Sequence, residues 1–242
     1  MSLLSSFPDG FRAVVWGASG GLGQAFAEIL SQDQRCAELV TISRNPTGVG
    51  RSLSYDPSDE ASIHDAATKA ADGRPLHLVL VAAGTLHTAS HQPEKALRQL
   101  HAPAFEEVMR INALLPALIA QASLAHLDRQ RAVFAALSAR VGSISDNRLG
   151  GWHSYRASKA ALNMLLKNIA IEVARKNKAA VIAGLHPGTV DTGLSEPFQA
   201  NVPDGKLFTP QHAATQLLSV VDALAGAQSG RVFDYAGQEV PS

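Results

Sequence analysis

The sequence predicts an α/β fold in which one doubly wound parallel sheet carries helices on both faces. Short apolar runs alternate along the chain with stretches of helical periodicity, the pattern of parallel strands joined by crossover helices. The chain has 242 residues, of which 46% are hydrophobic and 17% are charged, enough for one large core. We find no linker and no internal repeat, so we expect a single domain over residues 1–242.

The predicted strands are short apolar runs, and the predicted helices have amphipathic spacing. The strands cover residues 13–16, 39–43, 52–56, 76–81, 132–138, 180–185 and 231–235. The helices cover residues 21–31, 59–71, 105–127, 154–176 and 210–225. Asp59 is a good N-cap for the second helix, because its carboxylate can accept from a backbone amide of the first turn. The irregular segment 191–208 is either a lid over a substrate or an ordinary surface loop.

The first predicted strand runs directly into a glycine-rich turn. Residues 17–23 have the sequence Gly-Ala-Ser-Gly-Gly-Leu-Gly, and a helical stretch follows them. A strand, a glycine turn and a helix together let backbone amides and a helix N-terminus meet a pyrophosphate. Gly17, Gly21 and Gly23 have GxxxGxG spacing, and the alternative interpretation is a tight turn with no ligand.

Tyr155 and Lys159 lie four residues apart at the start of the fourth predicted helix. This spacing places the phenol and the ammonium on one helix face. A free tyrosine has a pKa near ~10, and a cation held beside it lowers that pKa. The pair therefore predicts a tyrosine that exchanges a proton with a carbonyl or alcohol oxygen, although such pairs also occur on plain helix surfaces.

Together these features resemble the short-chain dehydrogenase/reductase family over residues 11–235. The matches occur in the order found in the family: the glycine turn, Asp56 after the third strand, Ala83-Gly84 after the fourth, Tyr155 with Lys159, and Pro187-Gly188 after the sixth. Residues 150–163 and 230–237 resemble the C-factor and sniffer-type carbonyl reductase branch. The resemblance implies a Rossmann fold that binds a nicotinamide dinucleotide at the carboxyl ends of the strands.

The resemblance also implies the residues that contact this cofactor. They are Gly17, Ser19, Gly20, Gly21, Leu22 and Gly23 around the phosphates, Asp56 at the adenine, Ala83 and Gly84 near the adenosine ribose, and Tyr155, Lys159, Pro187, Gly188, Val190 and Thr192 near the nicotinamide. Asp56 has an alternative role as a turn residue before Pro57.

Arg44 decides the predicted cofactor preference. It ends the second strand, where NAD-preferring relatives usually carry an acidic residue, and no acid lies in residues 41–45. A guanidinium at this place can pair with a 2′-phosphate, so the sequence favours NADP(H) over NAD(H). The alternative is a solvated arginine in a loop.

The catalytic roles are likewise implied by the resemblance. Tyr155 would be the general acid, Lys159 would lower its pKa and bind the nicotinamide ribose, and Asn112 would hold a water in a proton relay with the lysine. We expect this relay because all three residues match the positions of the family's motif.

The sequence does not decide which serine is the active-site serine. Relatives end the preceding strand with Ser-Ser-x-x-Gly, and alignment on Gly142 places Ala139 at the usual serine position. We predict that Ser138 steadies the carbonyl oxygen, with Ser143 as the alternative. If neither serine reaches the substrate, turnover should be slow.

Composition excludes several other classes of function. Lys+Arg and Asp+Glu are both 21, and no dense basic run occurs, so we expect no nucleic-acid or membrane partner. The single cysteine, Cys36, and the absence of a signal-peptide pattern in residues 1–10 predict a cytoplasmic protein. The nine histidines form no ligand motif, so we expect no metal. Family members often assemble, and we expect a homodimer or homotetramer.

The sequence therefore predicts an oxidoreductase that reduces a ketone or aldehyde with NADP(H). One alternative is a dinucleotide-binding signalling or regulatory protein with little turnover, because C-factor relatives are associated with cell–cell signalling. Another is an NAD-dependent alcohol dehydrogenase, if Arg44 has no role. The substrate is not predicted, because loops of this kind vary freely on one fold.

Overall fold

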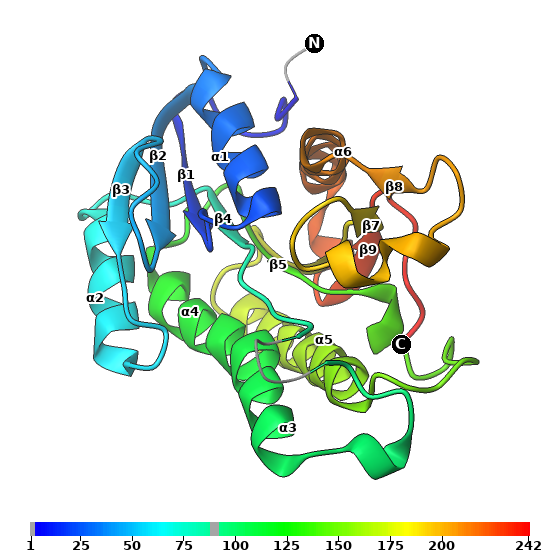
Figure 1. The fold of residues 1–242 in the computed structure, drawn as a ribbon. Coiled ribbons are helices and arrows are strands. Elements are labelled where there is room, and N and C mark those ends of the chain that lie inside the picture. Colours follow the sequence, from blue (N-terminus) through cyan, green and yellow to red (C-terminus); the bar gives the residue numbers. More distant parts are fainter. Residues whose placement is uncertain (1–2, 88–91) are drawn as a thin grey trace.

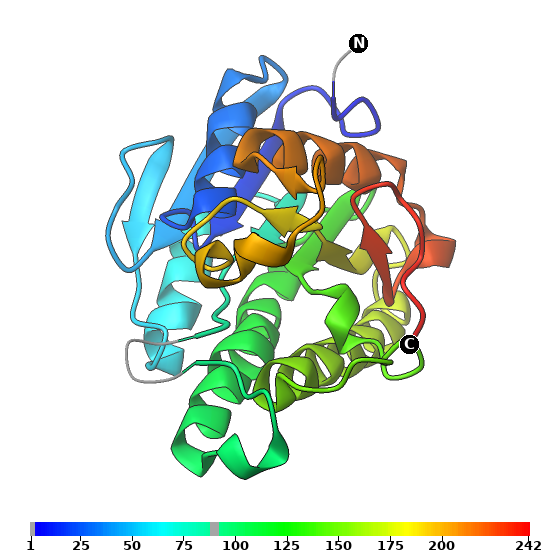
Figure 2. The same ribbon diagram turned by 45° about the vertical axis from the view of Figure 1, so that its right-hand side comes forward.

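A computed structural model describes residues 3–87 and 92–242 of the chain (Figure 1). Seven strands form one sheet in the order β3-β2-β1-β4-β5-β6-β9, and every neighbouring pair is parallel. Helices cover both faces of this sheet, as Figures 1 and 2 show. The predicted doubly wound parallel sheet, a Rossmann fold, is confirmed.

The inner strands of the sheet are short runs of mainly apolar residues, whereas at least half of the residues in the two edge strands are polar. The strands are β1 (Phe11–Trp16), β2 (Cys36–Ser43), β3 (Arg51–Ser54), β4 (Leu78–Val81), β5 (Ala132–Leu137), β6 (Ala180–His186) and β9 (Arg231–Asp234). Almost every residue of β1, β4, β5 and β6 is buried, because helices on both faces exclude water from the central strands.

Two helical layers sandwich the sheet. The helices are α1 (Gly21–Gln32), α2 (Glu60–Ala71), α3 (Ala102–Met109), α4 (Leu115–Ser123), α5 (His153–Ala174) and α6 (Pro210–Ala223). The core on one face contains Phe26 of α1 and Leu217 of α6, and the core on the other contains Ile63 of α2 and Leu166 of α5. As predicted, Asp59 caps α2, and its carboxylate accepts from the amide of Ala61 at 2.9 Å.

The direction of winding reverses at β1. This strand lies between β2 and β4, and the chain runs outward to β3 before it returns through α2 to β4 and continues to β9. The connections after β1 and β4 therefore leave the sheet in opposite directions, which opens a crevice at the carboxyl ends of these strands. Open α/β sheets bind their ligands at such a point.

The prediction of one regular helix over residues 105–127 was wrong, because a π-helical turn, η2 (Arg110–Leu114), separates α3 from α4. The amide of Leu115 donates to the carbonyl of Arg110, five residues earlier. Pro116 accounts for the irregularity, because it has no N–H with which to donate to the carbonyl of Asn112. Single π-turns of this kind are frequent at functional sites.

The helical run Ala102–His126 is also, within the described residues, the one stretch long and apolar enough to cross a membrane. Half of its most apolar window is buried inside the protein. Ile119 and Ala120 of this run lie in the core beneath the sheet. The apolar character of the run is therefore explained by packing.

The third and fourth strands differ from their predicted bounds. The third ends at Ser54, because Tyr55 turns into the core and packs edge-on against Trp16, with the ring centroids 5.1 Å apart. The fourth begins at Leu78, and Leu76 makes only an isolated bridge. Asp56 consequently lies in the turn before α2.

Segment 191–208 contains more order than predicted. Two short strands, β7 (Thr189–Val190) and β8 (Leu207–Phe208), pair in parallel, and the 3₁₀ helix η5 (Glu196–Asn201) lies between them. The amide of Asp191 donates to the carbonyl of Phe208 at 2.8 Å. The two ends of the segment are therefore held side by side.

Candidate active site

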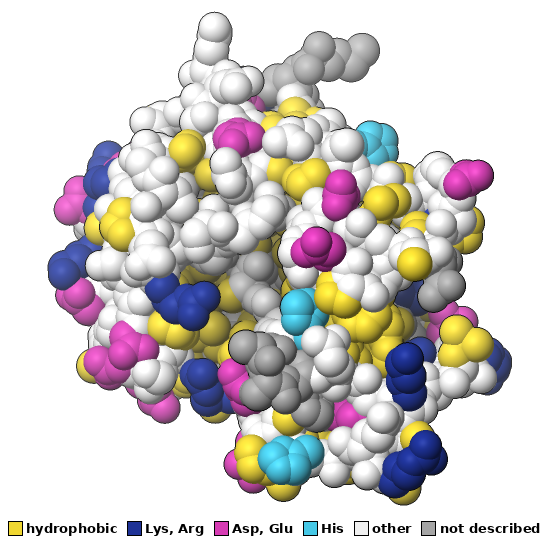
Figure 3. Space-filling view, viewed as in Figure 1, with side chains coloured by type: hydrophobic (Ala, Val, Ile, Leu, Met, Phe, Trp, Pro, Cys, Tyr) yellow, Lys and Arg dark blue, Asp and Glu magenta, His cyan; other side chains and the backbone are white. Residues whose placement is uncertain are grey.

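A cleft of about 630 Å³ opens at the crevice between β1 and β4. Its walls come from the ends of β1, β2 and β4 and from α3 and η2, and the face seen in Figure 3 is hollowed between the two sides of the molecule. The cleft brings together six of the predicted cofactor contacts: Gly17, Ser19, Gly20, Arg44, Ala83 and Gly84.

The glycine turn forms the inner wall of the cleft. A Cβ at Gly17 would lie 2.7 Å from the amide nitrogen of Ala83, and the φ of Gly17 is 77°. A Cβ at Gly23 would collide with the carbonyl oxygen of Gly17. Helix α1 starts at Gly21 and no described side chain caps it, which leaves first-turn amides such as that of Leu22 without a side-chain partner. These features fit a pyrophosphate that approaches the backbone closely.

Two arginines face the outer end of the cleft, Arg44 after β2 and Arg110 in η2. Burial raises the pKa of Tyr55, and the positive charges of Arg44 and Arg110 oppose that rise, so both guanidinium groups act on the same hydroxyl. Arg110 also donates to the carbonyl of Pro57 at 3.2 Å. Sequence reasoning identified Arg44 but missed Arg110, whose only local signal was its place two residues before Asn112.

Asp56, the predicted adenine contact, does not line the cleft. Its exposed carboxylate accepts from the amide of Ser58 at 2.8 Å and from the hydroxyl of Ser58 at 2.5 Å, and these bonds lower its pKa. Its neighbours Tyr55 and Pro57 line the cleft instead. From the sequence, Asp56 has an alternative role as a turn residue before Pro57. That role accounts for the hydrogen bonds of its carboxylate.

Helix α5 carries Tyr155 and Lys159, and the side chain of Lys159 lies next to Gly84 in the wall of the cleft. The Nζ of Lys159 donates to the carbonyl of Leu137 at 2.8 Å and lies 5.7 Å from the centre of the Tyr155 ring. Gly84 connects this pair to the cleft, because a Cβ added there would lie 3.7 Å from the Nζ of Lys159. The spacing of the pair along the helix thus brings both side chains to one place.

Burial controls the protonation of both groups. It raises the pKa of Tyr155 to about 12 and lowers the pKa of Lys159 to about 8. The sequence led us to expect a lowered tyrosine pKa, but the phenol is desolvated and the ammonium donates to Leu137. Tyr155 therefore carries its proton at neutral pH, the form that can donate to a carbonyl oxygen.

Asn112 is fully buried in η2, next to this pair. Its Oδ1 accepts from the amide of Thr85 at 2.8 Å, and its Nδ2 donates to the carbonyl of Thr85 at 2.7 Å and to the hydroxyl of Ser158 at 3.1 Å. The side chain therefore clamps the segment after β4 against α5. Both N–H groups of the side-chain amide are used, and the backbone carbonyl, deprived of an α-helical donor by Pro116, is a group that can accept from a water.

The two candidate serines have different partners. The hydroxyl of Ser138 donates to Oδ1 of Asn163 at 2.6 Å. Asn163 lies on α5, eight residues (163 − 155) beyond Tyr155. The two residues are therefore separated by about 12 Å along the axis of α5. The hydroxyl of Ser143 accepts from the amide of Asp146 at 3.1 Å, and its proton is not used by a described residue. Ser143 is therefore freer than Ser138 to donate to a substrate oxygen.

Trp152, Phe198 and His87 form an aromatic wall beside Tyr155. The ring of Trp152 lies 6.2 Å from that of Tyr155 and 5.1 Å from that of Phe198, and His87 lies 6.2 Å from Phe198. Trp152 has a φ of 49°, and its amide donates to the carbonyl of Glu94 at 2.5 Å. Sequence reasoning missed this wall, because its members come from separate loops and only the glycines before Trp152 marked a tight turn.

The predicted contacts after β6 fall in different settings. Thr192 packs on the glycine turn, because a Cβ at Gly21 would lie 2.6 Å from its Cγ2. Val190 is buried in the core beside α1 and α6. Pro187 and Gly188 remain partly exposed where β6 ends. The structure therefore brings Thr192, but not Val190, to the cofactor side.

A family model described as short chain dehydrogenase matches residues 12–203, most of the chain. The chain belongs to the short-chain dehydrogenase family.

Individual relatives agree with this family. The chain is 39% identical to the C-signal of Myxococcus xanthus over 133 residues, which cover 54% of this chain and 74% of that protein. The structure is similar to an NADPH-bound carbonyl reductase from chicken fatty liver, with a TM-score of 0.81, 24% identity, and 98% and 100% of the two chains covered. It is also similar to the carbonyl reductase Sniffer of D. melanogaster, with a TM-score of 0.82, 19% identity, and 96% and 99% covered. The structural matches establish the shared fold, and the predicted resemblance to the C-factor and sniffer-type branch is confirmed.

Trp16 of this short-chain dehydrogenase ends β1, just before the glycine turn. Its indole is completely buried, with an Nε1 that has no described partner. The indole packs against Tyr55, which lines the cleft. Trp16 therefore supports the outer wall of the cleft from the core.

Proposed function

We propose that this short-chain dehydrogenase reduces a ketone or aldehyde with NADP(H), and that Tyr155 donates the proton. The observation that carries the proposal is the position of Lys159, which lies next to Gly84 in the wall of the cleft and 5.7 Å from the centre of the Tyr155 ring. The similarity to carbonyl reductases supports the substrate class.

The preference for NADP(H) is supported by Arg44 and Arg110. Guanidinium groups pair well with phosphates, and two of them at the outer end of the cleft suit a 2′-phosphate. The glycine turn would hold the pyrophosphate, Ala83 and Gly84 would lie along the adenosine ribose, and Thr192 would approach from the opposite side. When bound, the dinucleotide supplies the hydride.

The residues of this chain then handle the proton and the developing charge. The Oη of Tyr155 donates its proton to the substrate oxygen. Lys159, held in place by Leu137, keeps a positive charge near the ring, and the carbonyl of Asn112 holds a water that can return a proton. Ser143 donates a hydrogen bond to the same oxygen as it gains charge. This assignment replaces Ser138, the residue favoured from sequence, because the hydroxyl of Ser138 is directed to Asn163.

We further propose that residues 191–208 form a lid within a single domain. Phe198 of this segment contacts Trp152, which contacts Tyr155, so the lid reaches the proposed catalytic residue through two ring contacts. His87 also contacts the carbonyl of Gly193 at 3.1 Å. A substrate between Tyr155 and these rings would be screened from water.

We also propose that the protein self-associates and acts in the cytoplasm. Leu114, Met164 and Ile171 expose apolar side chains on neighbouring helical elements, which suits a homodimer or homotetramer. Burial raises the pKa of the single thiol, Cys36, to about 11, so it is unreactive at neutral pH. Size-exclusion chromatography with light scattering tests the assembly.

A second function, dinucleotide-dependent signalling with little turnover, is favoured by two observations. Ala139 occupies the usual serine position, and the chain resembles the C-signal of Myxococcus xanthus over three quarters of that protein. A protein of this kind would bind NADPH but reduce carbonyl compounds slowly or not at all.

The Tyr155→Phe variant separates the two functions. We expect reduction of a panel of ketones and aldehydes to fall by ~10²–10⁴-fold, because the general acid is lost. NADPH affinity, followed through the fluorescence of Trp152 and the nicotinamide, should stay unchanged and serves as the folding control. Full activity in the variant would remove Tyr155 from the mechanism, and tight NADPH binding by a wild-type protein that reduces nothing would favour signalling.

A further inference from the structure

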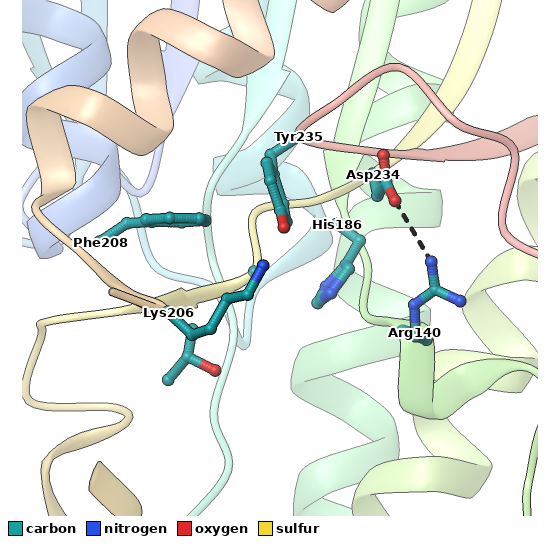
Figure 4. A pocket seen from close by; sticks show the side chains of 8 residues that line it. Arg140, His186, Lys206, Phe208, Asp234 and Tyr235 are labelled. Atoms are coloured by element: carbon teal, nitrogen blue, oxygen red, sulfur yellow. Dashed lines mark hydrogen bonds and ion pairs between the residues drawn. The ribbon is translucent and has the colours of Figure 1, made fainter. Parts of the chain in front are cut away.

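A second pocket lies where β5, β6 and β9 end, and Figure 4 shows the side chains that line it. Its volume is about 240 Å³. Arg140 on the rim of this pocket follows Leu137, whose carbonyl accepts from Lys159, by three residues (140 − 137). Gly188 and Thr189, which follow β6, also line it. The chain segment that holds Lys159 therefore continues into the wall of this pocket.

Packed rings give the pocket a defined wall. The rings of Phe208 and Tyr235 lie 4.7 Å apart at 73°, an edge-to-face contact. Both rings pack on Gly188, where a Cβ would lie 2.9 Å from Phe208 and 3.1 Å from Tyr235. Gly188 has a φ of 76°, which a residue with a side chain rarely adopts. The hydroxyl of Tyr235 is consequently held at the pocket.

The two cations of the lining differ in their ion-pair partners. Lys206 and Arg140 contribute two cations and Asp234 one carboxylate, and Arg140 is 3.2 Å from Asp234 and from Asp146. Lys206 makes no ion pair with a described side chain. In Figure 4 its ammonium points toward the hydroxyl of Tyr235 and away from the Arg140–Asp234 pair. The lining thus offers one uncompensated cation.

The imidazole of His186 also lines this pocket, and one of its nitrogens lacks a hydrogen-bond partner. Its Nδ1 is buried and has no hydrogen-bond partner within the part of the chain that the structure describes. Burial and the charge of Arg140 lower the pKa of His186 to about 4, and Asp234 opposes them, so the ring is neutral at pH 7. A neutral imidazole offers one N–H donor and one acceptor nitrogen. A buried nitrogen without a hydrogen-bond partner is unfavourable unless a ligand completes the site.

We propose that this pocket binds an anionic group, a carboxylate or sulfonate, that the carbonyl substrate carries. Lys206 supplies the charge, and Tyr235 and His186 supply hydrogen bonds through their O–H and N–H groups. Arg140 adds N–H groups that its two carboxylate partners leave unused. The inference rests on the proposed carbonyl reduction, although a free anion of the same chemistry would satisfy the same groups.

Paired substrates test the inference. Aldehydes that carry a carboxylate at increasing distance from the carbonyl are compared, by kcat/KM with NADPH, with their methyl esters. At the best length we expect the wild-type protein to prefer the acid by about tenfold, the effect of one charge-assisted contact. Lys206→Met should lose this preference, whereas Lys176→Met, an exposed lysine beyond the end of α5, should keep it. Equal kcat/KM for acid and ester at every length would overturn the proposal.

An NMR titration separates a failure of this inference from a failure of the proposed function. The imidazole of His186 is followed while the intact protein is titrated with acetate, with acetamide as the neutral control. A bound anion should raise the pKa of His186, and Lys206→Met should abolish the effect. If acetate shifts His186 but acidic aldehydes gain nothing, the pocket binds free anions and the substrate assignment is overturned. If no carbonyl compound is reduced, the proposed function fails. If the pKa of His186 also stays unchanged during the acetate titration, the anion site is overturned as well.

Discussion

Two sides of the cleft are built from different contacts. On the side of β1, β2 and β4, backbone groups dominate: Gly17 packs against the backbone of Ala83, and Asn112 holds both backbone groups of Thr85. On the side of β5, β6 and β9, the contacts join side chains from distant loops, such as the rings of Phe198 and Trp152 and the Arg140–Asp234 pair.

Under the proposed function, this difference separates cofactor binding from substrate choice. Backbone amides and carbonyls are the same in every relative, so the first side suits a dinucleotide that a whole family shares. Loop side chains vary freely without disturbing the sheet, so the second side can adapt to one substrate. Changes on the first side should therefore alter cofactor affinity, and changes on the second side should alter turnover.

After Tyr155→Phe, the largest effect should come from the serine on the substrate side. We expect Ser143→Ala to reduce kcat by ~10²–10³-fold, because a donor to the developing oxyanion is lost. Ser138→Ala is the matched control and should cost about tenfold or less, because its hydroxyl serves Asn163. Both variants should bind NADPH normally in a fluorescence titration. A larger loss at Ser138 would return the role to the residue first predicted from the sequence.

On the cofactor side, the two arginines should control the preference for NADPH over NADH. We expect Arg44→Ala and Arg110→Ala each to lower the ratio of the two affinities by about tenfold, because each removes a charge-assisted contact to phosphate. The turnover at saturating cofactor should not change. Arg98→Ala, an exposed arginine outside the cleft, is the control. An unchanged ratio in the double variant would favour the NAD-dependent alcohol dehydrogenase.

Lys159 lies between the two sides of the cleft, and its pKa leads us to expect that kcat depends on pH. Its pKa of about 8 means that it is charged below pH 8 and loses its proton above it, whereas Tyr155, with a pKa of about 12, stays protonated. We expect kcat for reduction to fall by about tenfold per unit above pH 8. Lys159→Arg keeps its charge, so its kcat should be flat between pH 7 and 9.5. A wild-type profile that is equally flat would show that the charge of Lys159 does not assist the proton transfer.

The smallest effect is expected at the aromatic wall. We expect Phe198→Ala to raise KM for a carbonyl substrate by about two- to tenfold, because a ring contact with Trp152 and cover over Tyr155 are lost. Phe198→Leu, which keeps most of the volume, should have a smaller effect, and Leu194→Ala in the same segment should have little. If Phe198→Ala instead weakened NADPH binding, the proposed division between the two sides would be wrong.

Much of the fold was predictable because it depends on local patterns. Each predicted strand is present, since a run of four to eight apolar residues is enough to identify a buried strand. Tyr155 and Lys159 could be paired because helical spacing alone places them on one face. The errors occur where tertiary packing overrides the pattern, as at Tyr55, which leaves the strand to pack against Trp16.

The sequence by itself determined the order of strands and helices, the glycine turn and the tyrosine–lysine pair. These features depend on periodicity, on the missing side chain of glycine and on helix geometry, all of which act over a few residues. Only the tertiary structure decided that the hydroxyl of Ser138 is directed to Asn163, that Arg110 joins Arg44, and that Lys206 lies near His186. Such contacts join residues that are dozens of positions apart, and their partners are selected by the packing of whole loops, which no local pattern encodes.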